Sequence, residues 1–411
     1  MSIEVLDGGL DVVNFGCRLN IAEGEAVRAA AKAAGARDTI IFNSCAVTDE
    51  AVRQARQAVR RALREQPEAQ VVVTGCAAEL EAERFAEMGA RVVRNDAKGL
   101  PESYGAGAPA VRSKTYSPAL SGADHARAFL GVQTGCSHSC TFCATVIARG
   151  TARSATVADV LASARVALNR GQREIVLTGV DLASYGDDSG TTLAALVEAL
   201  LALPIERLRL SSLDPNRIDT ALFALLTEEP RVMPHVHLSL QAGDDMILTR
   251  MKRRHRRAQV VDLVARLKAA RPEIAIGADL IAGFPTEDDA MFANSLALID
   301  DCDIVFGHIF PYSARAGTPA ARMPQVGRTV ARERAATLRE ANARRRHLWM
   351  DEQVGKLTNM LVERDGRSGH GENFASLMLG APATPGSIVP VRIGARDGDR
   401  LAAETLEDFG A

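Results

Sequence analysis

The stretch GCSHSCTFC, residues 135–143, contains three of the seven cysteines of a 411-residue chain, with the spacing C-x3-C-x2-C. It closely follows an apolar run, residues 129–133, that is predicted to be a strand. The three cysteines therefore occupy a loop at the carboxyl end of a strand, which is where α/β barrels place their active sites. Thiolates are soft ligands that suit zinc or an iron–sulfur cluster.

The spacing alone does not fix the chemical identity of this site. A structural zinc ion takes four protein ligands, and three cysteines leave one metal position open. His138 is a candidate fourth ligand, although the C-x-H-x-C spacing around it is cramped. The alternative is that all three cysteines are small buried hydrophobic residues, but their concentration in one loop argues against it.

An α/β series continues after the loop. Six strand-like runs alternate with five helical ones, which is typical of a parallel sheet. Six units are fewer than the eight of a closed barrel, so we predict an open partial (β/α)6 barrel. The predicted strands are residues 129–133, 174–182, 207–213, 235–241, 275–284 and 304–312, and the predicted helices are residues 157–169, 193–203, 220–227, 259–270 and 288–299.

On the amino-terminal side, strand, cysteine and helix recur three times, with Cys17, Cys45 and Cys76 separated by 28 and 31 residues. This matches the roughly 30 residues of a βαβ unit, and right-handed crossovers make such strands parallel. Neighbouring parallel strands would bring the three thiols to one edge of the sheet. The alternative, three unrelated core cysteines, is disfavoured by the repeat, whereas Cys302 is predicted to be an ordinary buried thiol. The strands are predicted at residues 11–17, 39–45 and 71–76, and the helices at residues 22–34, 48–65 and 77–88.

These patterns divide the chain into three domains and a linker. An α/β domain covers residues 1–97, and a barrel domain covers residues 129–353, the last part of which is an arginine-rich helix. Gly, Pro and Ser are frequent in the linker between them, residues 98–128. Residues 354–411 hold short strand-like runs between glycine-rich turns, which favours a small β-barrel. The predicted fold class is therefore α/β with a small all-β module at the carboxyl end.

The composition excludes several classes of protein. With 47% hydrophobic and 24% charged residues, the chain is neither disordered nor fibrous. A formal net charge of −2 provides no overall field that would attract nucleic acid. The amino terminus lacks the features of a signal peptide, and no apolar run reaches the roughly 18 residues of a membrane span. We expect a cytoplasmic monomer without a membrane partner, whose cysteines stay reduced.

Several motifs together resemble those of one enzyme family. The loop QTGCSHSCTFC is similar to the radical S-adenosylmethionine signature, and NFGCRLN, FNSCAVTDEA and TGCAAEL are similar to the cysteine motifs of methylthiotransferases. Further matches are ARGTARS, TGVDLASYGDD, LRLSSLDP, HLSLQAGDDMILTRMKR, ADLIAGFP and HIFPYSARAGTPAARM. The chain is therefore identified as a member of the radical S-adenosylmethionine methylthiotransferase family. It departs from the usual pattern at Val146, where many relatives have proline, at Thr286 in GFPTE and at Ala242 in SLQAG.

The resemblance implies that the cofactors are two 4Fe–4S clusters and S-adenosylmethionine. Reductive cleavage of S-adenosylmethionine at the first cluster would give a 5′-deoxyadenosyl radical that removes hydrogen from C2 of an adenine. Methylated sulfur would then pass from the second, auxiliary cluster to that carbon. The implied ligands are Cys136, Cys140 and Cys143 for the first cluster, whose fourth iron takes S-adenosylmethionine, and Cys17, Cys45 and Cys76 for the auxiliary cluster.

The stretch HIFPYSARAGTPAARMPQV most resembles the branch of the family that acts on N6-threonylcarbamoyladenosine at position 37 of tRNA, next to the anticodon. The expected product is the 2-methylthio derivative of that nucleoside. Two enzymatic alternatives are methylthiolation of N6-isopentenyladenosine in tRNA and of an aspartate in a ribosomal protein. The alternative of a different class is a zinc-containing RNA-binding protein without catalytic activity.

Contacts to S-adenosylmethionine are expected at strand ends on the active-site face of the barrel. We call residues 135–143 the cluster loop. Arg149 and Arg153 flank this loop and are candidates to pair with a carboxylate. Each of these residues could also be an ordinary polar group at a strand end. The candidate cofactor-binding residues are Gly179, Val180, Asp181, Ser239, Gln241, Asp279 and Arg153.

Basic stretches are candidates for contact with the anticodon arm of tRNA. MKRRHRR, residues 251–257, and ANARRRH, residues 341–347, could bind phosphates or could be solvated helix faces. The carboxyl-terminal module resembles the TRAM domain, an RNA-binding barrel, in which an aromatic ring would stack on a base. The RNA-binding candidates are Arg253, Arg254, Arg344, Arg345, Arg364, Arg367 and Phe374. The other expected partners are an electron donor such as flavodoxin or ferredoxin and a sulfur source.

Overall fold

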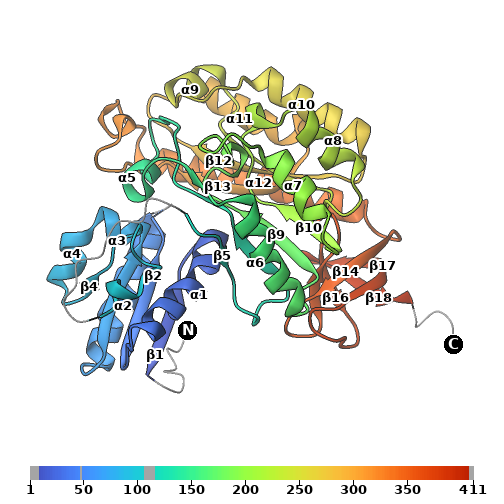
Figure 1. The fold of residues 1–411 in the computed structure, drawn as a ribbon. Helices are drawn as coiled ribbons and strands as arrows, with labels where there is room; N and C mark the ends of the chain where they lie inside the picture. Colours follow the sequence, from blue (N-terminus) through green and yellow to red (C-terminus); the bar gives the residue numbers. More distant parts are fainter. Residues whose placement is uncertain (1–8, 47–48, 106–115, 407–411) are drawn as a thin grey trace.

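The computed structural model describes residues 9–46, 49–105 and 116–406, which form three packed units (Figure 1). The amino-terminal unit is a parallel sheet in the order β1-β2-β3-β4, as the repeat predicts for its first three strands. Its strands are β1 (Leu10–Asn14), β2 (Thr39–Ser44), β3 (Gln70–Gly75) and β4 (Arg91–Val92), and its helices are α1 (Arg18–Ala33), α2 (Asp49–Glu65), α3 (Cys76–Leu80) and α4 (Ala82–Glu87).

Helices cover both faces of this sheet, so its inner strands are continuous apolar runs. Every residue of β2 is buried, and α1 packs on the face opposite to α2. The helix expected at residues 77–88 is instead two short helices, because Glu81 between them has a non-helical backbone (φ −129°, ψ 36°). The two-residue strand β4 is too short to give a sequence pattern.

The central unit is the open partial barrel that the sequence predicts. The parallel strands follow one another in chain order, and an isolated bridge joins Leu213, three residues after β10, to Leu238 of β11. The strands are β6 (Ala128–Gly131), β9 (Glu174–Thr178), β10 (Arg207–Leu210), β11 (His235–Gln241), β12 (Ala275–Ala282) and β13 (Ile304–Pro311). The helices outside them are α6 (Val157–Asn169), α7 (Leu193–Leu201), α8 (Thr220–Glu228), α9 (Asp245–Arg250), α10 (Arg257–Ala270) and α11 (Asp289–Asp301).

Small elements at the edges of the barrel escape the sequence pattern. The helix α5 (Thr145–Arg149) follows the cluster loop, and β7 (Gln133–Thr134) pairs with β8 (Arg153–Ser154) on either side of it. Short 3-10 helices are η1 (Pro101–Ser103), η2 (Leu182–Ser184), η3 (Pro215–Arg217) and η4 (Pro319–Arg322).

The stretch expected to be a linker contributes to the fold. Within it, β5 (Ala119–Leu120) pairs antiparallel with β6, and Lys98 and Tyr104 are buried. Residues 106–115 of this stretch lie outside the described residues. The amino-terminal unit therefore meets the barrel through packed side chains, with α1 against β5 and β6.

The helix α12 (Arg328–Asp351) leads to a closed five-stranded barrel, which confirms the small β-barrel. Its strands are β14 (Leu357–Val362), β15 (Ser368–His370), β16 (Ser376–Leu379), β17 (Ile388–Asp397) and β18 (Arg400–Thr405), of which the three-residue β15 is not predicted from the sequence. Met360 and Leu377 of this barrel share a core with Val305 and Trp349. The module is therefore docked against the amino-terminal ends of the central strands.

Among the described residues, no helix combines the length and the apolar character needed to cross a membrane.

Candidate active site

The amino-terminal cysteines come together because their strands are in register. Asn43 pairs with Thr74 and Ser44 with Gly75, so Cys45 and Cys76 leave neighbouring strands at the same height. Cys17 caps the start of α1, and the preceding Gly16 has a positive φ of 89°. A Cβ atom at Gly16 would lie 2.6 Å from the Cys45 sulfur, so only glycine allows this turn to approach Cys45.

The second set of cysteines lies in the loop before α5. Backbone contacts fix this loop: Thr141 N–H donates to the Met251 carbonyl (3.2 Å), and its hydroxyl donates to the Arg250 carbonyl (2.8 Å). A Cβ atom at Gly135 would lie 2.0 Å from the Thr151 carbonyl oxygen. Burial raises the pKa of Cys136 to about 12, so this thiol is neutral until a metal displaces its proton.

Asp181 and His138 form a polar pair beside Cys136. The Cys136 sulfur lies 3.8 Å from Asp181 Oδ2, and His138 Nε2 lies 3.0 Å from the same oxygen. Burial opposes ionisation of Asp181, but the hydrogen bond and charge of His138 outweigh it and lower its pKa. Asp181 therefore engages one of the two ring nitrogens of His138.

Arg253 lies beside Cys140, with Nη1 3.7 Å from the sulfur. Its other nitrogen donates to Asp214 Oδ2 (3.0 Å) and to the Ser239 carbonyl (2.6 Å). The basic stretch places Arg253 among the tRNA contacts, but the structure turns it into the barrel, whereas the adjacent Arg254 is exposed. The reason is that the buried carboxylate of Asp214 and the carbonyl of Ser239 in β11 both accept hydrogen bonds from this cation.

The sulfurs of each triad are not arranged as the ligands of one zinc ion. Zn–S bonds of about 2.3 Å would require sulfurs about 3.8 Å apart. In the described part of the chain, neither cysteine triad has all its sulfurs within 4.8 Å of one another. A cube of iron and sulfur is larger than one ion and is normally held by cysteine thiolates.

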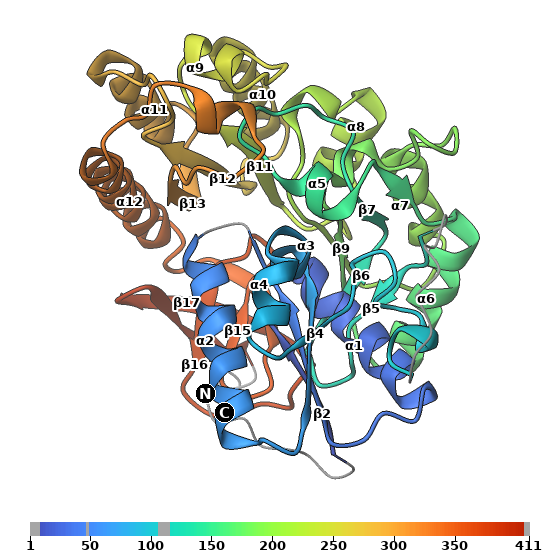
Figure 2. The same ribbon diagram turned by 90° about the vertical axis from the view of Figure 1, so that its left-hand side faces the viewer.

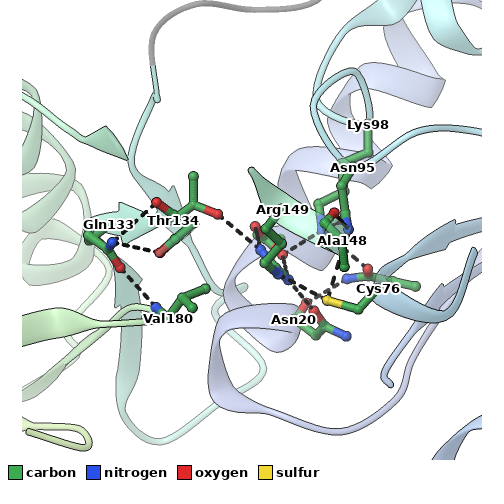
Figure 3. Close-up of polar contacts among 12 residues, drawn as sticks. Asn20, Cys76, Asn95, Lys98, Gln133, Thr134, Ala148, Arg149 and Val180 are labelled. Atoms are coloured by element: carbon green, nitrogen blue, oxygen red, sulfur yellow. Dashed lines mark hydrogen bonds and ion pairs between the residues drawn. The ribbon is translucent and has the colours of Figure 1, made fainter. Parts of the chain in front are cut away.

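Arg149 links the helix after the cluster loop to Cys76 of the amino-terminal triad (Figure 3). It is the last residue of α5, six positions after Cys143, and its Nε donates to the Cys76 sulfur of the other triad (3.0 Å). Its Nη atoms donate to both carboxylate oxygens of Glu23 (2.8 and 3.0 Å) and to Asn20 (2.8 Å). Arg149 thus pairs with a carboxylate, but that carboxylate belongs to α1 of the amino-terminal unit.

A second cation completes this buried network. Lys98 Nζ lies 2.5 Å from Glu23 Oε2 and 3.0 Å from Asn95 Oδ1, and Asn95 donates to the Ala148 carbonyl (2.9 Å). Burial opposes ionisation of Glu23, but Arg149 and Lys98 lower its pKa to about 2. With two cations and one carboxylate, the network carries a net positive charge beside Cys76. Figure 2 shows the resulting proximity of α3 and α5.

The floor of the barrel is polar and is closed by the carboxyl-terminal module. Phe374 stacks on His370 at 4.5 Å between ring centroids and lies 5.0 Å from His235. The guanidinium of Arg18, the residue after Cys17, lies 5.4 Å from the Phe374 ring. The residue after Cys17 therefore reaches the floor of the barrel, and Phe374, expected to stack on a base, stacks here on protein side chains.

The other predicted cofactor contacts are placed at the barrel mouth with different roles. The N–H groups of Val180 and Asp181 both donate to Gln133 Oε1 (3.0 and 2.9 Å), and a Cβ atom at Gly179 would lie 2.9 Å from that oxygen. Gln241 ends β11 with a positive φ of 71°. Arg153 lies on β8, Ser239 has its carbonyl engaged by Arg253, and Asp279 lies between two histidines.

Within the ranges that the structure describes, the remaining RNA-binding candidates contact different parts of the protein and share no common partner. Arg344 is exposed, and Arg345 pairs with Asp303 (2.5 Å). The exposed Arg364 donates to the Asp124 carbonyl (2.8 Å), and the exposed Arg367 to the Gly380 carbonyl (2.7 Å).

Two family models match the chain, the radical SAM superfamily over residues 130–299 and an uncharacterised protein family, UPF0004, over residues 10–93. A threonylcarbamoyladenosine tRNA methylthiotransferase MtaB of Rickettsia prowazekii is 40% identical over 90% of this chain and 91% of its own. The MtaB of Chlamydia pneumoniae is 33% identical over 99% of both chains. A tRNA-2-methylthio-N(6)-dimethylallyladenosine synthase of Cereibacter sphaeroides is 31% identical over 97% of this chain and 98% of its own.

A solved structure has the same fold. The radical S-adenosylmethionine methyltransferase TsrM of Kitasatospora setae superposes with a TM-score of 0.55, at 14% identity, over 76% of this chain and 74% of that one. The radical SAM match confirms an enzyme that uses S-adenosylmethionine and a 4Fe–4S cluster, so the non-catalytic zinc protein is excluded. The chain belongs to the radical S-adenosylmethionine methylthiotransferase family.

Proposed function

We propose that the enzyme attaches a methylthio group to C2 of N6-threonylcarbamoyladenosine at position 37 of tRNA, using two 4Fe–4S clusters and S-adenosylmethionine. The observation that carries this proposal is Arg149, at the end of the helix that follows the cluster loop, which donates a hydrogen bond to the Cys76 sulfur of the other triad (3.0 Å). When bound, the cofactors supply reductive cleavage of S-adenosylmethionine and a transferable sulfur, which is chemistry that no side chain offers for an aromatic C–H bond.

In this proposal the side chains hold, orient and shield the reacting groups. Cys136, Cys140 and Cys143 would bind the first cluster and Cys17, Cys45 and Cys76 the auxiliary one. Asp181 and Arg253 flank the first triad with opposite charges. Hydrogen bonds to cluster sulfurs and nearby charges set the reduction potential of a cluster, so Arg149 and Lys98 would favour the reduced state of the auxiliary cluster.

The polar barrel interior supports the choice of substrate. An isopentenyl group is apolar and makes no hydrogen bonds, whereas a threonylcarbamoyl group has a carboxylate, a hydroxyl and a urea. His237, Asp279 and the largely exposed His308 face the interior and offer polar partners. The relatives named as threonylcarbamoyladenosine methylthiotransferases, at 40% and 33% identity, point the same way.

The proposed tRNA contacts are the exposed arginines, such as Arg254, Arg344 and Arg367, which could neutralise backbone phosphates. The closed carboxyl-terminal barrel is of a size that suits a TRAM-like RNA-binding module. A flavodoxin or ferredoxin would donate the electron, and a separate sulfur source would rebuild the auxiliary cluster in the cytoplasm.

Mass spectrometry of nucleosides from total tRNA tests this proposal in a deletion strain, with and without the restored gene. We expect the 2-methylthio form of N6-threonylcarbamoyladenosine to disappear on deletion and to return with the gene. If this nucleoside is unchanged and the isopentenyl derivative is lost instead, the substrate assignment is wrong. If neither nucleoside changes, the ribosomal protein becomes the substrate to examine.

A further inference from the structure

Three side chains of types that can bind a metal ion converge on the interior face of the barrel. His237, Asp279 and His308 lie on the consecutive strands β11, β12 and β13. Asp279 is directly opposite His308 in the parallel register, and His237 is opposite Gly277. Alternate residues of a strand share a face, and these three side chains all project to the interior face. None of them belongs to either cysteine triad.

The geometry of this cluster is that of a ligand set. His237 Nε2 and His308 Nδ1 lie 3.1 and 3.2 Å from the same atom, Asp279 Oδ1. All three ligand atoms lie within 4.8 Å of one another. Ligand atoms about 2.1 Å from one metal ion are separated by about 3.0–3.4 Å in octahedral or tetrahedral geometry. The two imidazole–carboxylate distances therefore match neighbouring positions around a single ion.

The surrounding backbone makes room for this arrangement. A Cβ atom at Gly277 would lie 2.4 Å from His237 Nδ1, so a side chain at this position would displace the imidazole. The exposed fraction of the side chains rises from 7% for His237 to 22% for Asp279 and 61% for His308. The cluster is thus closed at β11 and open at β13, the last strand of the partial barrel.

We propose that His237, Asp279 and His308 bind a divalent first-row transition metal ion, separate from the iron–sulfur clusters. Two imidazoles and one carboxylate suit zinc, iron or manganese. Three protein ligands leave positions open for oxygen ligands of another molecule. Without an ion, the same contacts would be a simple hydrogen-bonded relay, and the experiment below separates the two cases.

The open positions suggest what the ion binds, an inference that rests on the proposed function. The N6 substituent of the proposed substrate carries a carboxylate and a hydroxyl. A substrate carboxylate approaching the barrel interior would meet the negative charge of Asp279. A divalent ion bound by one carboxylate and two neutral imidazoles has a net charge of +1, so it would attract that anion and chelate its oxygens.

Zinc binding to the full-length enzyme tests the metal site without substrate. Protein reconstituted to its full iron and sulfide content, so that the cysteines are occupied, is passed over a chelating resin, incubated with Zn²⁺ and gel-filtered. We expect the unmodified enzyme to retain about one zinc ion per chain, and Asp279→Asn and His308→Ala to retain less than about a tenth of that. Iron and sulfide should be unchanged in both variants.

The matched control is His347→Ala, which removes a histidine paired with Asp399 on the surface (3.1 Å) and should leave zinc retention unchanged. Retention of no zinc by the unmodified enzyme, or equal retention by Asp279→Asn and His308→Ala, would overturn the metal site. If zinc depends on Asp279 and His308 but the deletion strain loses a different nucleoside, the metal site stands and the proposed substrate fails. If the threonylcarbamoyl derivative is lost but the enzyme retains no zinc, the proposed substrate stands and the metal site fails.

Discussion

The two cysteine triads are built in different ways. Cys136, Cys140 and Cys143 lie in one loop, whose shape is set by local backbone contacts such as those of Thr141. Cys17, Cys45 and Cys76 come from three strand ends, and their arrangement depends on sheet register and on Arg149, a residue of the other unit. The local triad can therefore be recognised as a motif, whereas the assembled triad requires the correct packing of two units.

The largest effect that this contrast predicts is a separation of two activities. Cys140→Ala should abolish both cleavage of S-adenosylmethionine and formation of methylthio product, because it removes a proposed ligand of the first cluster. Cys45→Ala should retain some cleavage but transfer no sulfur. Chromatography of 5′-deoxyadenosine and of modified nucleosides measures both. Several turnovers of methylthio product by Cys45→Ala would show that the assembled triad does not hold the sulfur donor.

The next effect concerns the residue that joins the triads. Arg149→Ala leaves the buried carboxylate of Glu23 with Lys98 as its main cation and should lower the free energy of unfolding by about 3 kcal/mol. It also removes the hydrogen bond to Cys76, so the proposed auxiliary cluster should change its reduction potential, measured by electron paramagnetic resonance titration, while the first cluster keeps its own. A double-mutant cycle with Glu23→Gln serves as the control, and additive losses would show that the pair is not coupled.

A smaller effect is expected for two neighbouring arginines, of which one lies beside the local triad and the other is exposed. Arg253→Ala leaves Asp214 without its cation beside Cys140 and should reduce cleavage of S-adenosylmethionine by about tenfold or more. Arg254→Ala should leave cleavage intact, weaken tRNA binding severalfold and lower the salt dependence of binding by about one counterion. An Arg253 variant with normal cleavage but weak tRNA binding would place this side chain at the RNA after all.

The smallest effect is confined to acid pH. The pKa of Glu23 is about 2 in the folded protein against an ordinary value of 4.5. Ionised Glu23 therefore stabilises the fold above pH 4.5, and this contribution is lost as the pH falls from 4.5 towards 2. Chemical denaturation at several pH values should show a shallower decline for Glu23→Gln across that interval. If the free energy of unfolding declines equally with pH in both proteins, ionised Glu23 is not stabilised by the network around Cys76.

Features that depend on short stretches of sequence could be predicted. The strand–cysteine–helix repeat predicted the first three strands of the amino-terminal sheet, and the cluster loop was recognised from its spacing. The ion pair between Glu23 and Arg149 could not be predicted, because 126 residues separate its partners. Neither residue belongs to a sequence motif that would single out the other. Arg253 and Arg254 belong to one basic run, and only the fold directs one inward. From the sequence, Phe374 is predicted to be available for stacking on a base. In the structure, its ring packs against His235 and His370, because the carboxyl-terminal barrel is docked there.

The central claim, that each triad holds its own 4Fe–4S cluster, is tested most directly by iron and sulfide analysis of anaerobically reconstituted protein. We expect about eight iron atoms per chain for the unmodified enzyme, and about four for both Cys45→Ala and Cys140→Ala. About four iron atoms in the unmodified enzyme, with no loss in Cys45→Ala, would contradict it, because the amino-terminal triad would then hold no cluster.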